Sequence, residues 1–364
     1  MKIKLLLCLA GLILCLASTA QQQYTTKNII YISIDGYRWK ELFRGAERAL
    51  LVNKKYNTDT AGNLKKYWSE NQEERRKLLM PFTWNYLSEH GQLYGNRDLG
   101  NNVNVRNKAW ISYPGRAESL TGYADPAITT NSHPDNPNET VLEFLNNQQG
   151  FKGKVVTFAS WDAVAKIVNR NRSGMLVNIP FDNLTGNHLS EAEKLASETQ
   201  HYAPKIWGDG ERLDANTYAM ARSYIFAQHP RVVYIDLADT DEYGHEGKYD
   251  AYLDAIHNID AMIASLWKGL QEDAFYRNKT TFIIVPDHGR GDEHQWTSHG
   301  ASIPHANETW LLVLGPDTAP LGEIKTSQQL YQDQFAKTLA AFLGFNFTSK
   351  HPVGEAVTSV LGKK

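Results

Sequence analysis

The sequence predicts an α/β fold in which a mostly parallel central sheet is covered by helices on both faces. Short apolar runs alternate along the chain with segments of helical pattern, and this alternation is typical of a parallel sheet. The apolar runs are rich in Val, Ile and Phe with little polar alternation, as expected for strands buried on both faces. With 364 residues, of which 42% are hydrophobic, the chain is long enough to bury a large core.

The expected elements follow one another along the chain. Strands are expected at 28–34, 154–159, 231–236, 280–286 and 310–314. Helices are expected at 81–89, 140–147, 215–227, 249–270 and 328–343. The charged stretch 51–77 is interpreted as solvated helix without chemistry. The polar stretch 170–210 is interpreted as a small cap or insertion over the sheet, with an ordinary long loop as the alternative.

The first 20 residues have the pattern of a signal peptide. Lys2 and Lys4 precede an apolar run at 5–17, and the small residues at 18–20 suit cleavage. A membrane anchor is the alternative, but the run is short for a span of about 20 residues and no charge cluster follows it. We therefore expect export to the periplasm or the medium, with 21–364 as a single domain that has no membrane span after cleavage.

Cysteine content and net charge exclude several kinds of function. Both cysteines lie in the expected signal peptide, so the mature domain would have neither a thiol nucleophile nor Cys-ligated zinc. A net charge of -2 provides no bulk attraction to nucleic acid or to an anionic membrane. No nucleic-acid-binding surface is therefore expected.

Carboxylate and imidazole side chains follow three of the expected strands at their carboxyl ends, and one more His comes from a nearby loop. They are Asp35, Asp241, His245, Asp287, His288 and His299. A single such Asp is more often a helix cap, but ligands of α/β sheets bind at this edge, where all six are expected in loops. Mixed His and Asp sets suit zinc, and this number suffices for two divalent ions; manganese and iron are alternatives.

Ser112 lies at an expected junction between a strand and a helix. The apolar residues 109–111 resemble a strand, and Pro114 suits the first turn of the helix that follows. A helix N-terminus favours an anion through its free N–H groups and its dipole. A simple capping Ser is the alternative. Beside a two-metal site, we interpret Ser112 as a nucleophile.

In this order, the motifs resemble the alkaline phosphatase superfamily, especially its nucleotide pyrophosphatase/phosphodiesterase branch and related secreted bacterial phosphatase-like proteins. IDGYR is similar to the branch's Asp-Gly-Phe-Arg, SYPGR to Thr-Phe-Pro-Asn-His, DEYGH to Asp-x-x-Gly-His, PDHG to Asp-His-Gly, and SHG to its last His. The resemblance implies an alkaline phosphatase-like fold and two zinc ions. It implies one ion on Asp35, Asp287 and His288, another on Asp241, His245 and His299, and Ser112 as both metal ligand and nucleophile.

Two residues depart from that branch. Gly115 stands where the branch has an Asn that contacts the phosphate, and Arg116 replaces a His. With Arg116, SYPGRAESLTG also resembles the sulfatase signature, whose Cys or Ser becomes formylglycine beside one calcium ion and an Asp-Asp pair. Here Gly36 follows Asp35, so that pair is missing, and the surplus His ligands do not suit calcium, which prefers oxygen.

We therefore predict a metal-dependent hydrolase of phosphate monoesters or diesters with Ser112 as nucleophile. Arg116 is expected to bind a non-bridging phosphoryl oxygen, with a surface salt bridge as the alternative. Arg38 and Asn104 are weaker candidates for that role, and His294 is a candidate for supporting the metal ligands. A formylglycine/calcium sulfatase is the first alternative function, and a non-catalytic binding protein on the same fold is the second.

Overall fold

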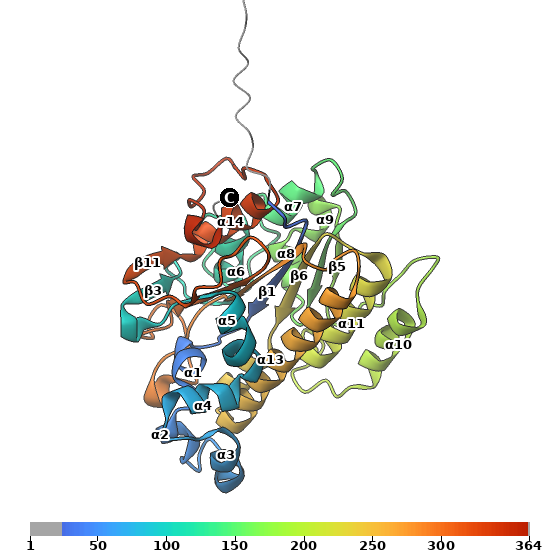
Figure 1. The fold of residues 1–364 in the computed structure, drawn as a ribbon. Coiled ribbons are helices and arrows are strands. Elements are labelled where there is room, and N and C mark those ends of the chain that lie inside the picture. The colour runs from blue at the N-terminus through green and yellow to red at the C-terminus, as the bar shows by residue number, and fades with distance from the viewer. Residues whose placement is uncertain (1–23, 363–364) are drawn as a thin grey trace, which may run out of the picture.

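The computed structural model describes residues 24–362, so the expected signal peptide lies outside the described residues (Figure 1). An eight-stranded sheet forms the centre, in the order β10-β2-β9-β7-β1-β6-β4-β5, and a small sheet has the order β11-β3-β8. The strands are β1 (Asn28–Ile34), β2 (Gln92–Tyr94), β3 (Asn101–Asn104), β4 (Val155–Ala159), β5 (Leu176–Asn178), β6 (Val232–Leu237), β7 (Thr280–Pro286), β8 (Glu308–Thr309), β9 (Leu311–Leu314), β10 (Gly322–Glu323) and β11 (Gln328–Tyr331).

The helices surround the central sheet (Figure 1). They are α1 (Trp39–Arg44), α2 (Arg48–Leu51), α3 (Thr60–Tyr67), α4 (Gln72–Leu79), α5 (Ser88–His90), α6 (Ser112–Thr121), α7 (Val141–Asn146), α8 (Val164–Ile167), α9 (Arg170–Ser173), α10 (Glu191–Thr199), α11 (Asp214–Gln228), α12 (Asp239–His245), α13 (Tyr249–Glu272) and α14 (Phe335–Phe342). Short turns complete the set: the π-helical η1 (Thr83–Leu87) and the 3-10 turns η2 (Arg97–Leu99), η3 (Gln200–Tyr202), η4 (Glu293–Gln295), η5 (Gln332–Gln334) and η6 (Thr358–Val360).

The register of the three middle strands brings their carboxyl ends together. β1 pairs in parallel with both β6 and β7, and Ile34 lies opposite Leu237 on one side and Pro286 on the other. The residues that follow these three positions therefore emerge side by side at one edge of the sheet. β9 runs antiparallel to β7 and to β2, so the sheet is mostly, not wholly, parallel, as predicted.

Hydrophobic cores on both faces fix this arrangement. Ile30, Ile32 and Ile34 of β1 pack into the core on the α13 side, whereas Ile29 and Tyr31 pack into the core that contains α6 and α14. This alternation follows from the pleat, which turns successive side chains to opposite faces. Each fully buried Ile contributes about 1.5–3 kcal/mol, so the strands that present the site are held firmly.

The long helix α13 shows why the sequence forms these elements. Tyr252, Ile256, Ile259, Ile263 and Leu266 recur at intervals of three or four residues, and all five are buried. Such spacing places them along one stripe of a helix that faces the sheet. The predicted helix at 249–270 is therefore confirmed, as are the five predicted strands to within one residue at their ends.

The structure corrects three expectations about elements. Residues 328–331 form β11, which pairs in parallel with β3, so only 335–342 of the expected helix 328–343 are α-helical. Residues 176–178 form the edge strand β5, so the stretch 170–210 is not an insertion wholly outside the sheet. Its helix α10 packs against α11. Residues 109–111 form no strand; they belong to a loop in which Trp110 has a φ of 53°.

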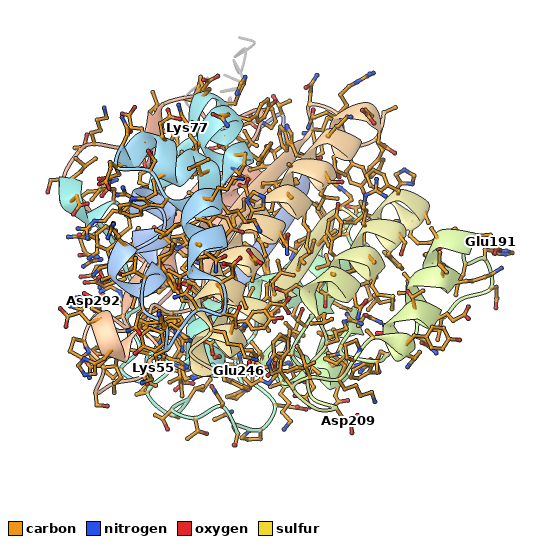
Figure 2. All side chains as sticks on the ribbon, turned by 90° about the horizontal axis from the view of Figure 1, so that it is seen from below. Lys55, Lys77, Glu191, Asp209, Glu246 and Asp292 are labelled. Atoms are coloured by element: carbon orange, nitrogen blue, oxygen red, sulfur yellow. The ribbon has the colours of Figure 1, made fainter. Side chains whose placement is uncertain are left out.

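Charged side chains of both signs lie at the periphery of the molecule, as Lys77, Glu191 and Asp209 illustrate (Figure 2). Within residues 24–362, no helix has the length and apolar character needed to cross a membrane.

Candidate active site

The six predicted metal ligands meet at the carboxyl ends of β1, β6 and β7. Ligand atoms of Asp35, Asp287 and His288 lie within 4.8 Å of one another, and so do those of Asp241, His288 and His299. The two groups share His288, which the sequence analysis had assigned to one of them alone. Each group offers both oxygen and nitrogen donors.

His245 lies beside the second group. Its Nε2 is 2.8 Å from Asp241 Oδ2 and 3.0 Å from His299 Nε2. The expectation that Asp241 and His245 lie in a loop is wrong, because both are on α12. Their spacing of four residues puts them on one face of that helix, pointing the same way.

The imidazoles are oriented by backbone carbonyls outside the two groups. His288 Nδ1 is 2.8 Å from the carbonyl oxygen of Gly289, and His299 Nδ1 is 3.3 Å from that of Trp110. A carbonyl only accepts, so each Nδ1 donates, and once the ring is deprotonated at Nε2 the lone pair of that atom points into the site. The Nε2 atoms of His245 and His299 face each other at 3.0 Å, an arrangement that a cation between them would satisfy.

Arginines lie behind two of the carboxylates. Asp35 accepts from Arg116 Nη2 through Oδ2 at 2.9 Å and turns Oδ1 toward His288 Nε2 at 3.1 Å. Asp241 accepts from Arg290 through Oδ1 and turns Oδ2 toward His245. Each of these carboxylates therefore has one oxygen fixed from outside and the other directed into the site.

This arrangement keeps both carboxylates ionised. Burial is the largest single effect and by itself would raise their pKa values, but at Asp35 Arg116 and His288 together outweigh it and hold that pKa below its usual value. Arg290 and His299 do the same at Asp241, whose pKa lies well below its usual value. Ionised carboxylates and inward imidazole lone pairs are the donors that zinc accepts, so the residues present fit two divalent cations.

Ser112 is the first residue of α6 and does not cap it. The N-cap is Ile111, which makes no side-chain capping bond. Ser112 Oγ instead lies 3.2 Å from His288 Nε2 and 3.4 Å from Asp35 Oδ1, beside the first group of ligands. The capping interpretation is therefore wrong, and the hydroxyl projects from a helix N-terminus toward the site.

A buried carboxylate holds the loop that leads to Ser112. Glu118 accepts from the backbone N–H groups of Arg106 and Asn107, at 2.8 Å each. Asn107 Oδ1 in turn accepts from the N–H groups of Ala109 and Trp110, at 3.0 Å each. Because the Trp110 carbonyl accepts from His299, this loop connects α6 to the orientation of a proposed ligand.

Arg116 does not project into open space. It is fully buried, and its three guanidinium nitrogens donate to Asp35, Asp236 and Asp287. The surface salt-bridge alternative is therefore wrong. Arg116 lies beneath the carboxylates, and its contact with a substrate stays a prediction.

The weaker candidates lie elsewhere. Arg38 pairs with Glu41 and Glu47, and Asn104 Oδ1 accepts from Gln329 Nε2 at 3.0 Å. His294 lies in η4, outside both groups of ligand atoms.

Sequence reasoning missed Arg290 and Asp236. Arg290 donates to Asp241 and also to the carbonyls of Trp296 and Thr297, at 2.8 and 2.7 Å. Asp236 accepts from Arg116 Nε at 2.5 Å inside β6. A carboxylate within an otherwise apolar strand was the available signal for Asp236, because a buried charge needs a partner. Arg290 gave no such signal, because its partner lies far away in the sequence.

Comparisons with known proteins give one match to a family model. Residues 209–330 match the Metalloenzyme superfamily and contain five of the six proposed ligands. No curated protein sequence matches significantly.

Solved structures share the fold over nearly the whole chain. Alkaline phosphatase PafA aligns with a TM-score of 0.61 at 12% identity, over 93% of this chain and 99% of that one. A putative sulfatase from Bacteroides thetaiotaomicron aligns with a TM-score of 0.60 at 12% identity, over 93% and 75%. The phosphonate monoester hydrolase of Silicibacter pomeroyi aligns with a TM-score of 0.54 at 15% identity, over 92% and 76%. The chain thus shares the fold of these hydrolases over nearly its whole length, and its residues 209–330 match the Metalloenzyme superfamily.

Proposed function

We propose that the chain is a metal-dependent hydrolase of phosphate esters in which Ser112 is the nucleophile. The observation that carries this proposal is the position of Ser112 Oγ, 3.2 Å from His288 Nε2 and beside the carboxylate of Asp35. A hydroxyl among ligands for two cations is suited to attack on an anionic ester. Asp35, Asp287 and His288 would hold one ion, and Asp241, His245 and His299 the other. We further propose zinc as the metal and export directed by residues 1–20.

The residues of the chain account for the chemical steps. When bound, two divalent ions would supply neutralisation of phosphoryl charge and a lowered pKa for a hydroxyl group. Ser112 Oγ attacks phosphorus, the ester oxygen leaves, and the phosphoryl group remains on the serine. The proton that Ser112 loses passes to solvent, a solvent proton is taken up by the leaving ester oxygen, and the N-terminus of α6 stabilises the anionic serine oxygen. Water then hydrolyses the phosphoserine and restores the hydroxyl.

A sulfatase is the second candidate, because Arg116 completes a Ser-x-Pro-x-Arg sequence and a putative sulfatase shares the fold. The turn after β1 disfavours it. Gly36 has a φ of 56°, and a Cβ there would collide with Asp241 Oδ1, so the acidic pair of sulfatases has no room. Gly115 likewise has no room for the Asn of the diesterase branch, since a Cβ would overlap the Asp287 carbonyl.

The test compares Ser112→Ala with Ser119→Ala in the protein without residues 1–20. Ser119 lies on the same helix and is also buried, but its hydroxyl donates to the Arg116 carbonyl, at 3.0 Å, and not toward the proposed ligands. We expect Ser112→Ala to retain its metal ions and to lose roughly a thousandfold or more of kcat with an aryl phosphate. Ser119→Ala should keep most of its activity.

Metal content and peptide mass separate the candidate functions. Zinc at two ions per chain, with unmodified serine at position 112, supports the phosphatase. One calcium ion with formylglycine at position 112 and turnover of aryl sulfates would establish the sulfatase instead. Full activity of the Ser112→Ala variant would exclude Ser112 as the nucleophile. Absence of turnover with every phosphate and sulfate ester would favour a non-catalytic binding protein.

A further inference from the structure

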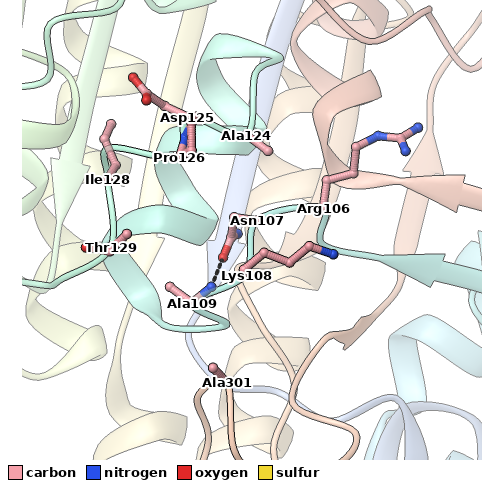
Figure 3. Close-up of a pocket in the computed structure, with 10 residues that line it drawn as sticks. All are labelled: Arg106, Asn107, Lys108, Ala109, Ala124, Asp125, Pro126, Ile128, Thr129 and Ala301. Atoms are coloured by element: carbon pink, nitrogen blue, oxygen red, sulfur yellow. Dashed lines mark hydrogen bonds between the residues drawn. The ribbon is translucent and has the colours of Figure 1, made fainter.

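A cavity of about 620 Å³ lies beside the loop that precedes Ser112. Its lining comes from 106–109, from 124–126, from 128–129 and from Ala301 (Figure 3). In that view Arg106 and Lys108 lie on one side of the opening, and Asp125, Ile128 and Thr129 lie on the other. A volume of this size is ordinary for a pocket that binds a small organic molecule.

Two walls of the cavity belong to segments that also carry candidate active-site residues. Ala109 precedes Ser112 by three residues, so their Cα atoms are at most about 11 Å apart. Ala301 follows His299 by two residues. The two walls also touch: a Cβ at Gly300 would lie 3.7 Å from Ile111 Cγ2 and 3.9 Å from the Ala109 carbonyl oxygen. A ligand whose phosphoryl group reaches Ser112 therefore has this cavity as its neighbour.

The lining combines apolar surface with one cation that lacks an ion pair among the described residues. Ile128 and the alanines provide the apolar part. Arg106 is already paired with Asp333 Oδ2 at 2.5 Å and stacks on Tyr331. Asp125 accepts from Asn138 Nδ2 at 2.7 Å. Lys108 is exposed and forms no salt bridge or side-chain hydrogen bond within residues 24–362, so its charge is available to a ligand.

We propose that this cavity receives the organic group esterified to the phosphate, and that Lys108 favours a group with a second negative charge. The inference rests on the proposed function and gives it a substrate class: esters of compact, partly apolar alcohols or phenols that carry an additional anionic group. Lys108 acts here as a specificity residue and takes no part in bond breaking.

Binding calorimetry with two non-hydrolysable ligands tests the inference. Benzylphosphonate and 4-carboxybenzylphosphonate differ only in the added carboxylate, and neither requires turnover. The metal-loaded wild type should bind the carboxylate ligand roughly twofold to fivefold more tightly, as an exposed ion pair allows. Lys108→Ala should remove this preference, and 0.5 M salt should reduce it by screening. Lys77→Ala, which changes an exposed lysine on α4, should keep it.

A second variant tests the cavity itself. Thr129→Trp, at the exposed rim, should weaken binding of both ligands by obstructing the cavity. Equal affinities for the two ligands in the wild type would overturn the inference, as would a preference that survives Lys108→Ala or unchanged binding in Thr129→Trp. A lysine-dependent preference without Ser112-dependent turnover would keep the inference and overturn the proposed function. Ser112-dependent turnover without a lysine-dependent preference would keep the proposed function and overturn the inference.

Discussion

At Arg116, a single guanidinium holds carboxylates from three neighbouring strands. Asp35 follows β1, Asp236 lies in β6, and Asp287 follows β7. Arg116 and Asp236 are fully buried, so the cost of removing these charges from water is high and is offset only while all of them stay together. The residue thus joins the three strand ends from which the proposed ligands project.

Replacement of this arginine should destabilise the protein strongly. We expect Arg116→Ala to cost about 3–5 kcal/mol of unfolding free energy without metal, because three carboxylates lose their cation. Added divalent metal should recover part of the loss by supplying positive charge nearby. Arg170→Ala is the control, because its ion pair with Asp182 is half exposed and should contribute about 0–1 kcal/mol. Urea unfolding with and without metal measures the unfolding free energy of both variants. Equal losses of unfolding free energy in the two variants would contradict this account.

Glu118 should make stability depend on pH. Burial raises its pKa to about 7, although the backbone N–H groups of Arg106 and Asn107 oppose that effect. The ordinary value is 4.5, so between about pH 4.5 and 7 the folded protein binds more protons than the unfolded chain. The contribution of Glu118 to stability is therefore greatest below pH 4.5 and is lost as the pH rises toward 7.

The comparison with Glu118→Gln isolates this titration. From pH 5 to pH 8 the unfolding free energy of the wild type should fall, relative to that of the variant, by up to about 3 kcal/mol. Denaturant titrations at several pH values provide the measurement. A wild type that instead gains stability over the variant in this range would show that the N–H donors outweigh burial.

Among the structural elements, the turn after β1 has the strictest requirement. Gly36 adopts a φ of 56°, and a Cβ at this position would collide with Asp241 Oδ1. The same turn donates from Gly36 N to Asp287 Oδ1, at 3.1 Å. A backbone conformation that favours glycine therefore packs directly against two of the proposed ligands.

Gly36→Ala should therefore impair metal binding as well as stability. We expect the substitution to displace Asp241 and to weaken the ion held with His245 and His299. Gly153→Ala is a matched control, because Gly153 has a φ of 71° but no atom within 4 Å of the added Cβ. The control should lose about 1–2 kcal/mol through backbone strain and keep its metal. Metal analysis after dialysis distinguishes the two, and full retention in Gly36→Ala would show that Asp241 is not a ligand.

At the scale of the whole molecule, metal should link separate parts of the fold. The proposed ligands follow β1 and β7, lie on α12 or belong to the loop with His299, so an ion bound by them favours the folded state alone. Removal of metal with a chelator should lower stability by about 3 kcal/mol when the ion was present at a hundredfold excess over its dissociation constant. Thermal unfolding before chelation, after it and after readdition provides the measurement.

Two histidine variants identify the source of that response. His299→Ala should respond less to chelation than the wild type does. His201→Ala should respond fully, because His201 is exposed and pairs with Asn183, away from the site. A wild type whose unfolding temperature does not change with chelator would contradict the proposed metal centre.

The sequence by itself determined the parts of this protein that depend on local pattern. Runs such as 28–34 and 280–286 are mostly apolar and β-branched, which predicts buried strands, and the residues that follow parallel strands emerge at one edge of the sheet. That reasoning was enough to predict that Asp35, Asp287 and His288 lie close together. It also predicted helices on both faces, because each face of such a sheet must be covered.

Only the tertiary structure decided the features that depend on distant partners. The short strand β11 exists because 328–331 pairs with β3, although the local pattern favours helix. Arg116 could not be placed from sequence, because the carboxylates that it binds come from three other segments. The same holds for Arg290 and for the sharing of His288 between the two ligand groups. Local propensity acts over a few residues, whereas charge pairing and strand register act across the whole fold, and so the chemistry of the site depended on the tertiary structure.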